Sequence, residues 1–361
     1  MSTRIGIVGM PNAGKSSLFN ALTRAGAEAA NYPFTTIEPN VAVLPVRDPR
    51  LEEVAQTVGA SEIVWDTIDF HDIAGLVAGA HQGEGLGNRF LANIRETDAI
   101  VHVVRAHADE GVVHPEGRVD PLADIATIET ELALADLEQA ERRVERVAKQ
   151  ARGGDRVAVA EEAWLHEVIA ALGAGRPVRT VPAPEEAPQA ARDLGSLTAK
   201  PVLFVANVDE GSDEVPADIA AHAAAQGARA VAVSARIESE LAELDDEDAA
   251  AMRAELNASE SGLERVVREA FALLRLIAFF TAGESKPAQS WHLRRGLTAW
   301  HAAGEIHTDI QRGFVRAEVI GWRELVDAGG YAGARERGTL RLEGRDYAMA
   351  DGDVITVKFS P

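Results

Sequence analysis

A glycine-rich octapeptide near the N-terminus carries the side chains with the clearest chemistry. Residues 9–16 read Gly-Met-Pro-Asn-Ala-Gly-Lys-Ser and match the pattern G-x-x-x-x-G-K-[ST]. The glycines allow the backbone to curl so that its N–H groups point at phosphate oxygens, and a following helix adds its positive N-terminal end. Lys15 would reach the β- and γ-phosphates, and the Ser16 hydroxyl would ligate Mg²⁺. The pattern predicts a site for a nucleoside triphosphate.

A second motif supplies groups that could hold the metal and sense the γ-phosphate. Residues 72–75 read Asp-Ile-Ala-Gly and match the D-x-x-G of nucleotide-dependent switches. In such switches the aspartate, Asp72 here, holds a magnesium-bound water, and the N–H of the glycine, Gly75 here, contacts the γ-phosphate. Thr35 and Thr36 lie where a switch threonine would complete the magnesium shell. The two motifs together predict a magnesium-dependent nucleotide switch.

The residues that would read the base depart from a guanine-specific pattern. Residues 207–210 read Asn-Val-Asp-Glu, where a guanine-binding protein carries N-K-x-D with an aspartate that accepts hydrogen bonds from guanine. Asn207 fits, but Glu210 is one methylene longer, and Val208 replaces the lysine that would flank the base. Because a lost polar contact can cost orders of magnitude in discrimination, the sequence predicts ATP, or relaxed ATP/GTP use. Ser234 begins a weak base-edge loop motif after the next strand.

The residue after the switch motif cannot orient an attacking water. Ras-like enzymes place a glutamine there, whereas this chain has Leu76. Unassisted Ras-type turnover is only ~10⁻⁴ to 10⁻³ s⁻¹, so we expect slow intrinsic hydrolysis. Candidate replacements for the glutamine are His81, Gln82 and His114. Catalysis comes from one of these, from elsewhere in the chain, or from a partner.

Two further polar residues allow a structural or a chemical interpretation. His102 lies in the middle of an apolar run, which favours a packed core residue. Asn12 could help to hold a monovalent cation such as K⁺ against the β- and γ-phosphates, in place of an arginine finger.

Short apolar runs alternate with helical periodicity over most of the chain. β-branched runs predict buried strands, and residues 18–22 carry apolar side chains at helical spacing. Strands that alternate with helices predict an α/β fold, with a mostly parallel sheet covered on both faces. The predicted strands are Arg4–Gly9, Ile63–Phe70, Ala99–Val104, Val202–Ala206 and Ala228–Val233.

A helical insertion and a C-terminal domain complete the predicted organisation. Residues 121–196 carry apolar side chains every three, four or seven residues, broken at a Gly-Gly pair, which predicts an antiparallel helical hairpin. The nucleotide-binding domain then comprises 1–120 and 197–277. Residues 278–361 alternate strand-like runs with glycine turns, so we expect a small α+β domain with little helix.

Composition limits the compartment and the partners. The 361 residues include 57 acidic and 36 basic side chains, for a net charge of −21, which excludes a generic polyanion binder and disfavours DNA. Residues 291–361 hold ten of each sign, so RNA contact is least unfavourable there. Cysteine is absent, which excludes disulfides and thiolate catalysis. With no apolar run of membrane length and no signal segment, we expect a cytoplasmic protein without a membrane partner.

The motifs, taken in order, resemble one family, the YchF subfamily of Obg-like P-loop ATPases. The resemblance covers nearly the whole chain, and several long motifs in one order make it specific. Besides the phosphate loop it includes NYPFTTIEPN at 31–40, DIAGLVAGA at 72–80, GEGLGN at 83–88, IRETDAI at 94–100, NVDE at 207–210, AAGEIHTD at 302–309, RLEGRDY at 341–347 and DGDV at 351–354.

The resemblance implies a P-loop domain with the helical arm inserted and a C-terminal TGS domain, a ubiquitin-like β-grasp module. It also implies Mg²⁺-dependent binding and hydrolysis of ATP in preference to GTP, and association with ribosomes. Magnesium would be held by Ser16 and Thr36, and the Val208 backbone would lie near the adenine. The nucleotide-binding positions carried over are Asn12, Ala13, Gly14, Lys15, Ser16 and Ser17.

Three functions remain open from the sequence. The favoured one is a slow ATPase that acts as a nucleotide-gated switch on the ribosome, with γ-phosphate ordering of Thr36 and the Gly75–Gly87 loop released on hydrolysis. The second is a non-catalytic adapter in which ATP stabilises a partner-binding form. The third, a guanine-specific translation GTPase, is disfavoured by Val208 and Glu210. RNA contact through the TGS domain is a further possibility.

Overall fold

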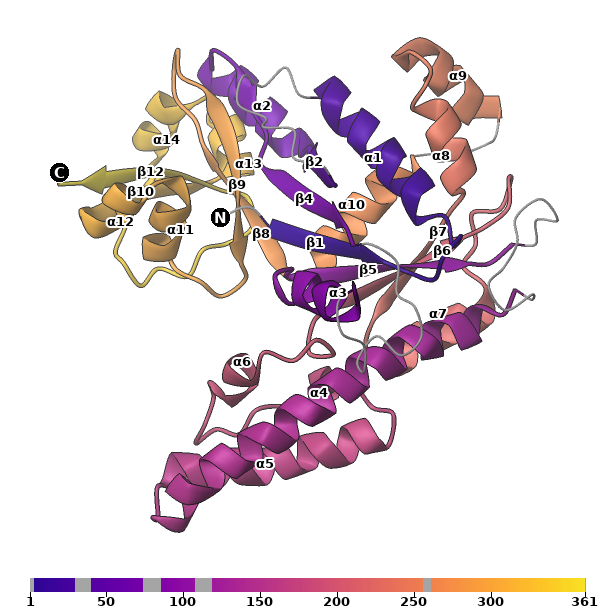
Figure 1. Cartoon of the computed structure of the whole chain (residues 1–361). Coiled ribbons are helices and arrows are strands. Elements are labelled where there is room, and N and C mark those ends of the chain that lie inside the picture. Colours follow the sequence, from indigo (N-terminus) through magenta and orange to yellow (C-terminus); the bar gives the residue numbers. More distant parts are fainter. Residues whose placement is uncertain (1–2, 30–39, 74–85, 108–118, 256–260, 361) are drawn as a thin grey trace. The chain divides into compact units, whose positions relative to one another are not determined.

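The chain divides into two compact units, each with its own six-stranded sheet (Figure 1). The first unit is Thr3–Leu44 with Asp69–Leu273, and the second is Pro45–Ile68 with Leu274–Pro361. The structure, a computed structural model, describes residues 3–29, 40–73, 86–107, 119–255 and 261–360.

The first unit is built on a sheet of mostly buried strands. These are β1 Thr3–Val8, β2 Val41–Pro45, β4 Thr67–Asp72, β5 Ala99–Arg105, β6 Val202–Asn207 and β7 Arg229–Val233, in the order β2-β4-β1-β5-β6-β7. β1 pairs in parallel with β5, β5 with β6, and β6 with β7. Every residue of β5 and β6 is buried, as expected of a parallel sheet covered on both faces. The predicted α/β architecture is confirmed.

Helices cover this sheet with apolar stripes, as α10 shows, whereas α9 packs on α8 instead. In α10, Leu263, Val266, Val267 and Ala270 are buried at helical spacing while the intervening residues face solvent. The helices between the strands are α1 Lys15–Ala29, α3 Leu86–Arg95, α7 Ala217–Ala225, α8 Ala235–Leu241, α9 Asp246–Glu255 and α10 Gly262–Leu273.

The predicted helical arm is confirmed as an antiparallel pair, α4 Pro121–Arg152 and α5 Arg156–Gly173 (Figure 1). Asp120 and Asp155 begin the two helices, because their carboxylates accept backbone N–H groups of the first turn. Buried side chains of both helices form one core with the return segment, which contains the 3₁₀ helix η1 Val178–Thr180 and helix α6 Ala190–Leu194.

A buried carboxylate ties the arm to the segment that returns to the sheet. Asp136, on α4, is fully buried. Its Oδ1 accepts from the Leu197 N–H at 2.8 Å, and its Oδ2 accepts from the Thr198 N–H at 2.8 Å and the Thr198 hydroxyl at 2.7 Å. Three donors on one carboxylate replace the water that burial removes, so the arm is anchored at its base.

The strand predicted over Ile63–Phe70 is wrong in one respect, because the structure divides it between two sheets. β3 Ile63–Val64 joins the sheet of the second unit and β4 joins that of the first. The break lies at Asp66, whose N–H donates to the Ser290 hydroxyl at 2.9 Å. The Asp66 carboxylate accepts from its neighbour Thr67 and from the His292 N–H, both at 2.9 Å. These partners turn the chain out of the extended pairing that the apolar pattern suggested.

The second unit is a mixed sheet with helices packed on it. Its strands are β3, β8 Leu276–Thr281, β9 Ala288–Arg294, β10 Phe314–Gly321, β11 Arg341–Glu343 and β12 Asp353–Phe359, in the order β11-β10-β12-β8-β9-β3. β12 pairs in parallel with β8, and the hairpin partners β8 and β9 are antiparallel. This arrangement confirms the predicted C-terminal sheet domain.

The expectation of little helix in the C-terminal part is wrong. The helices there are α11 Ala299–Ile306, α12 Thr308–Arg312, α13 Trp322–Asp327 and α14 Tyr331–Arg337. They are short, and local caps rather than long periodicity define them: Thr298 and His301 form a capping box at the start of α11. No helix in the described ranges is both long and apolar enough to cross a membrane.

Residues 45–68, which the sequence analysis assigned to the first domain, belong to the compact unit of the C-terminal part. Helix α2 Pro49–Val58 buries Leu51 and Val54 in one cluster with Phe280 of β8. The sheet of the second unit therefore completes its core with a segment from the N-terminal third of the chain.

A candidate nucleotide site at the carboxyl ends of the first sheet

The phosphate loop lies between β1 and α1, and it needs glycine at two points. A Cβ on Gly9 would lie 2.4 Å from the Val103 carbonyl oxygen, so the loop backbone packs directly on β5. Gly14 has a φ of +99°, and a Cβ there would lie 2.2 Å from Nδ2 of Asn207. Any side chain at Gly14 would strain the backbone and displace Asn207. The glycines of the sequence pattern therefore have steric reasons in this fold.

The Lys15 ammonium is held inside this loop. Its Nζ donates to the Met10 carbonyl oxygen at 2.8 Å, and the residue is 8% exposed. Burial lowers the pKa of Lys15, while the charge of Asp72 acts in the opposite direction. Ser16 and Ser17 follow on the first turn of α1 and are exposed. A cation enclosed by its own loop, beside exposed hydroxyls, suits an anionic ligand.

Asp72, at the end of β4, has the properties expected of a magnesium-site carboxylate. Its N–H donates to the Asn40 carbonyl oxygen at 3.0 Å, which fixes the end of the strand. Its Oδ1 is buried and has no hydrogen-bond partner among the described residues. Burial raises the pKa of Asp72, and the charge of Lys15 opposes this rise.

The donor chemistry of this site fits Mg²⁺. The Asp72 carboxylate and the Ser16 hydroxyl offer oxygen atoms, which this cation prefers. In the part of the chain that the structure describes, no three His, Asp or Glu side chains form a metal-binding group.

Asn207 joins the phosphate loop to the loop after β7. Its Nδ2 donates to the Ala13 carbonyl oxygen at 3.1 Å, and its Oδ1 accepts from the Ala235 N–H at 3.0 Å. The side chain is buried, at 7% exposed, so neither bond is exchanged readily for water. The first residue of the predicted base-reading motif is therefore a positioning residue for two loops.

The other base-reading candidates lie beside it. Val208 is buried, at 4% exposed, in the core cluster of the sheet, and its N–H donates to the Val233 carbonyl oxygen at 3.0 Å. Ser234 caps α8, with its hydroxyl oxygen accepting from the Ile237 N–H at 3.5 Å. Glu210 is exposed and forms an ion pair, described below, across the two loops.

A histidine that the sequence analysis missed supports the Asn207 backbone. His107 Nδ1 lies 2.9 Å from the Asn207 carbonyl oxygen, so Nδ1 carries the hydrogen and donates. The Ala106 N–H donates to the same oxygen at 2.9 Å, and Arg105 Nε donates to the His107 carbonyl oxygen at 3.2 Å. Their position in the chain could have indicated this role, because Arg105 ends β5, the parallel neighbour of β6, and Ala106 and His107 follow directly.

Several predicted site residues lie outside the described residues. These are Thr35, Thr36, Gly75, His81, Gln82 and His114. The switch threonine, the γ-phosphate contact and a histidine replacement for the missing glutamine therefore stay predictions.

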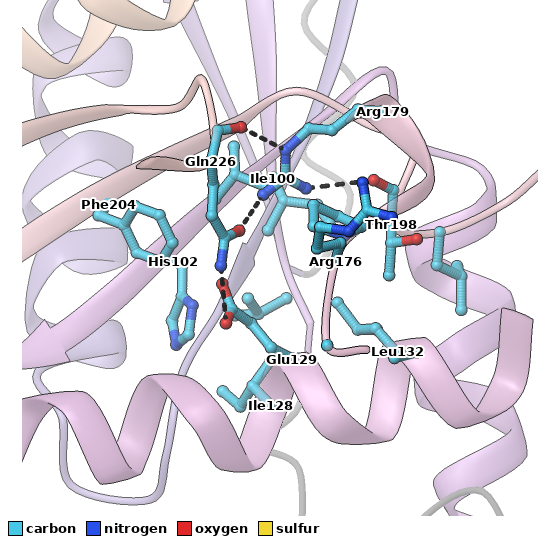
Figure 2. Close-up of a pocket in the computed structure, with 16 residues that line it drawn as sticks. Ile100, His102, Ile128, Glu129, Leu132, Arg176, Arg179, Thr198, Phe204 and Gln226 are labelled. Atoms are coloured by element: carbon cyan, nitrogen blue, oxygen red, sulfur yellow. Dashed lines mark hydrogen bonds between the residues drawn. The ribbon is translucent and has the colours of Figure 1, made fainter. Parts of the chain in front are cut away.

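A cavity of about 40 Å³ between the sheet and α4 is not the nucleotide site (Figure 2). One water needs about 10–15 Å³ and a drug-sized ligand about 300 Å³ or more. His102 and Phe204 line the cavity from the sheet, with ring centroids 5.4 Å apart, and Glu129 lines it from α4. Figure 2 shows the Gln226 side chain between Arg179 and Glu129. The Nε2 of Gln226 donates to the Glu129 carboxylate at 3.1 Å. His102 is 3% exposed, which confirms it as a packed core residue.

A strand, a glycine-dependent loop around an enclosed lysine, and a helix form the architecture of P-loop NTPases, and the first unit is a domain of this class. Family models agree: residues 4–147 match a model described as "50S ribosome-binding GTPase", and residues 276–360 match a YchF GTPase C-terminal model described as a "protein of unknown function".

Curated relatives match the chain from end to end. The ribosome-binding ATPase YchF of Haemophilus influenzae is 50% identical over 363 residues, and that of Bacillus subtilis is 46% identical over 366 residues; each alignment covers 100% of both chains. The chain belongs to the YchF family.

Solved structures agree with this assignment. The YchF GTPase of Schizosaccharomyces pombe is 33% identical, with a TM-score of 0.87 and coverage of 99% of this chain and 98% of that one. A GTP-binding protein of Pyrococcus horikoshii covers 99% of this chain and 100% of its own, with a TM-score of 0.63 and 21% identity, which supports the fold alone.

Proposed function

We propose that this chain binds MgATP, hydrolyses it slowly, and acts in the cytoplasm as a nucleotide-gated switch on the ribosome. The ribosome is proposed as the partner because several relatives, 46–50% identical over their whole length, are named ribosome-binding ATPase. The names of the relatives disagree on the nucleotide, because the Schizosaccharomyces pombe protein is called a GTPase. The base preference must therefore be argued from this chain's own residues.

Binding of a triphosphate is supported by the enclosed charge of Lys15 and the loop around it. On binding, the lysine would exchange the Met10 carbonyl oxygen, now at 2.8 Å, for phosphate oxygens. Ser16 and Asp72 would hold Mg²⁺ directly or through water, with Thr36 predicted to complete the shell. Magnesium would neutralise charge on the phosphates during transfer.

The preference for adenine is carried by one observation: backbone donors next to the base-reading motif are already engaged. The Val208 N–H donates to Val233 and the Ala235 N–H donates to Asn207, each at 3.0 Å. Guanine presents the acceptor O6 at the edge where adenine presents a donor amino group. With these two N–H groups engaged, neither is left to donate to the O6 of guanine, which favours adenine.

Slow turnover is supported by Leu76, which cannot hydrogen-bond to a water. The group that replaces the missing glutamine stays a prediction, with His81, His114 or K⁺ near Asn12 as candidates. RNA contact through the C-terminal unit is proposed on charge alone, since residues 291–361 carry as many basic as acidic side chains.

Calorimetry and phosphate release test the proposal. With Mg²⁺ present, we expect heat from ATP that exceeds that from GTP, and multiple-turnover phosphate release above a Lys15→Ala control. Pelleting with ribosomes should differ between ATP-loaded and ADP-loaded protein. Nucleotide binding without phosphate release above the control would favour the non-catalytic adapter. A clear preference for GTP would favour the guanine-specific translation GTPase. The absence of heat from either nucleotide would refute the nucleotide site.

A further inference from the structure

An ion pair engages one oxygen of the carboxylate that a guanine-specific site would need free. Glu210 stands three residues after Asn207, where the aspartate of N-K-x-D would accept hydrogen bonds from guanine. In the structure its Oε1 lies 2.5 Å from Nη2 of Arg236. Arg236 follows β7 and Glu210 follows β6, and these strands are parallel neighbours, so the pair spans the two loops beside the base-reading motif.

The arginine of this pair has a second acidic partner, although its side chain is 71% exposed. Arg236 Nε donates to Oε1 of Glu240, one turn further along α8, at 3.1 Å. This hydrogen bond, together with the charges of Glu210, Glu240 and Asp209, raises the pKa of Arg236, so the guanidinium is charged at every pH of interest. Glu240 therefore aims the Arg236 side chain, and its guanidinium reaches across to Glu210.

The two purines respond differently to this arrangement. Guanine offers donors, the ring N–H and the 2-amino group, to a carboxylate whose oxygens must be free to accept them. The two guanine donors together need both oxygens of a carboxylate, and here Oε1 of Glu210 is already paired with the Arg236 guanidinium. The N–H groups of that guanidinium, which are donors themselves, would also repel the guanine donors. Adenine has an acceptor, its ring nitrogen N1, in place of the guanine N–H, and it lacks the 2-amino group. It therefore has no donor at this edge that would need the carboxylate as an acceptor.

We infer that Arg236 is a specificity-determining residue, which withholds the Glu210 carboxylate from guanine and thereby widens the preference for ATP over GTP. The inference deepens the proposed function and rests on it, because the base must lie between the loops after β6 and β7. The discrimination acts against guanine, because the acceptor that guanine needs is already paired, and it requires no new contact to adenine.

The test is the affinity of the magnesium complexes of ATP and GTP for wild-type protein and for Arg236→Ala. Freed of its partner, Glu210 becomes available to guanine. We expect the Kd for GTP to fall by about fivefold, the upper range for an exposed ion pair, and the Kd for ATP to change by less than about twofold. Arg236→Lys, which keeps the charge on a flexible stem, should retain most of the wild-type ratio.

Two controls isolate the carboxylate. Arg236→Ala combined with Glu210→Ala should lose the gain in GTP affinity, because the acceptor is gone. Arg312→Ala removes an equal charge from an exposed ion pair with Asp309 in the other compact unit, and should leave both affinities unchanged.

Each outcome has a distinct meaning. If wild-type protein binds neither nucleotide, the proposed function fails, and this inference fails with it. If wild-type protein binds ATP but Arg236→Ala leaves the GTP-to-ATP ratio unchanged, or weakens both nucleotides alike, the inference is overturned while the nucleotide site stands. A gain in GTP affinity that survives Glu210→Ala would also overturn it.

Discussion

Replacement of His102 by leucine should change how the stability of the first sheet depends on pH. His102 lies in the middle of β5, is 3% exposed, and its Nε2 has no hydrogen-bond partner in the described part of the chain. Burial, with smaller contributions from the charges of His222 and Lys15, lowers the pKa of His102 to about 3. Leucine is close in size to histidine and cannot take up a proton.

The sign and size of the effect follow from the two states of the chain. In the unfolded chain a histidine takes up a proton near pH 6.5, whereas in the folded protein His102 stays neutral down to about pH 3. As the pH falls below 6.5, protons therefore bind the unfolded chain first, and stability is lost until the pH reaches about 3. At about 1.4 kcal/mol per pH unit, the interval from pH 6.5 to pH 5 costs about 2 kcal/mol.

Hydrogen exchange with mass spectrometry measures this cost locally. For peptides that cover β5, the opening free energy of His102→Leu relative to wild type should rise by about 2 kcal/mol between pH 7 and pH 5, after correction for intrinsic exchange. Every other titrating group cancels in this double difference. His166→Leu, at an exposed position of α5, is the matched control and should show no such rise. A difference between His102→Leu and wild type that is the same at both pH values would refute the argument.

Three further substitutions probe the site and the arm. Gly14→Ala places a Cβ 2.2 Å from Asn207 Nδ2, at a residue with a φ of +99°. The ATP affinity measured by calorimetry should therefore fall at least tenfold, or about 1.4 kcal/mol. An unchanged affinity would mean that the loop tolerates the shift. Asp136→Asn sets an amide against the Thr198 N–H, and exchange from α4 should show a loss of about 2–3 kcal/mol; unaltered protection would contradict the anchoring role. Lys15→Ala should abolish ATP binding while circular dichroism stays that of the wild type; retained binding would contradict the assignment of the loop.

Local sequence patterns were sufficient to predict most of the architecture. Strands β1, β5, β6 and β7 are apolar runs bounded by turns, and the arm is a long periodic pattern broken by a Gly-Gly pair, so these elements could be predicted without knowledge of distant residues. The edge strand β2, in which only alternate residues are buried, was not among the predicted strands. The break between β3 and β4 could not, because the partners that hold Asp66 lie more than two hundred positions further along the chain. The short C-terminal helices also escaped prediction, because caps rather than periodicity define them.

The sequence by itself was enough to predict a triphosphate site, because the phosphate loop is one contiguous motif that contains the glycines, the lysine and the serine. Only the tertiary structure revealed how that loop is supported. The bonds from Asn207 to Ala13 and Ala235, the support from His107, and the pairing of Glu210 with Arg236 join the ends of neighbouring parallel strands. Parallel strands bring together segments far apart in the chain, so which side chains meet at their carboxyl ends depends on strand order, which no local pattern encodes.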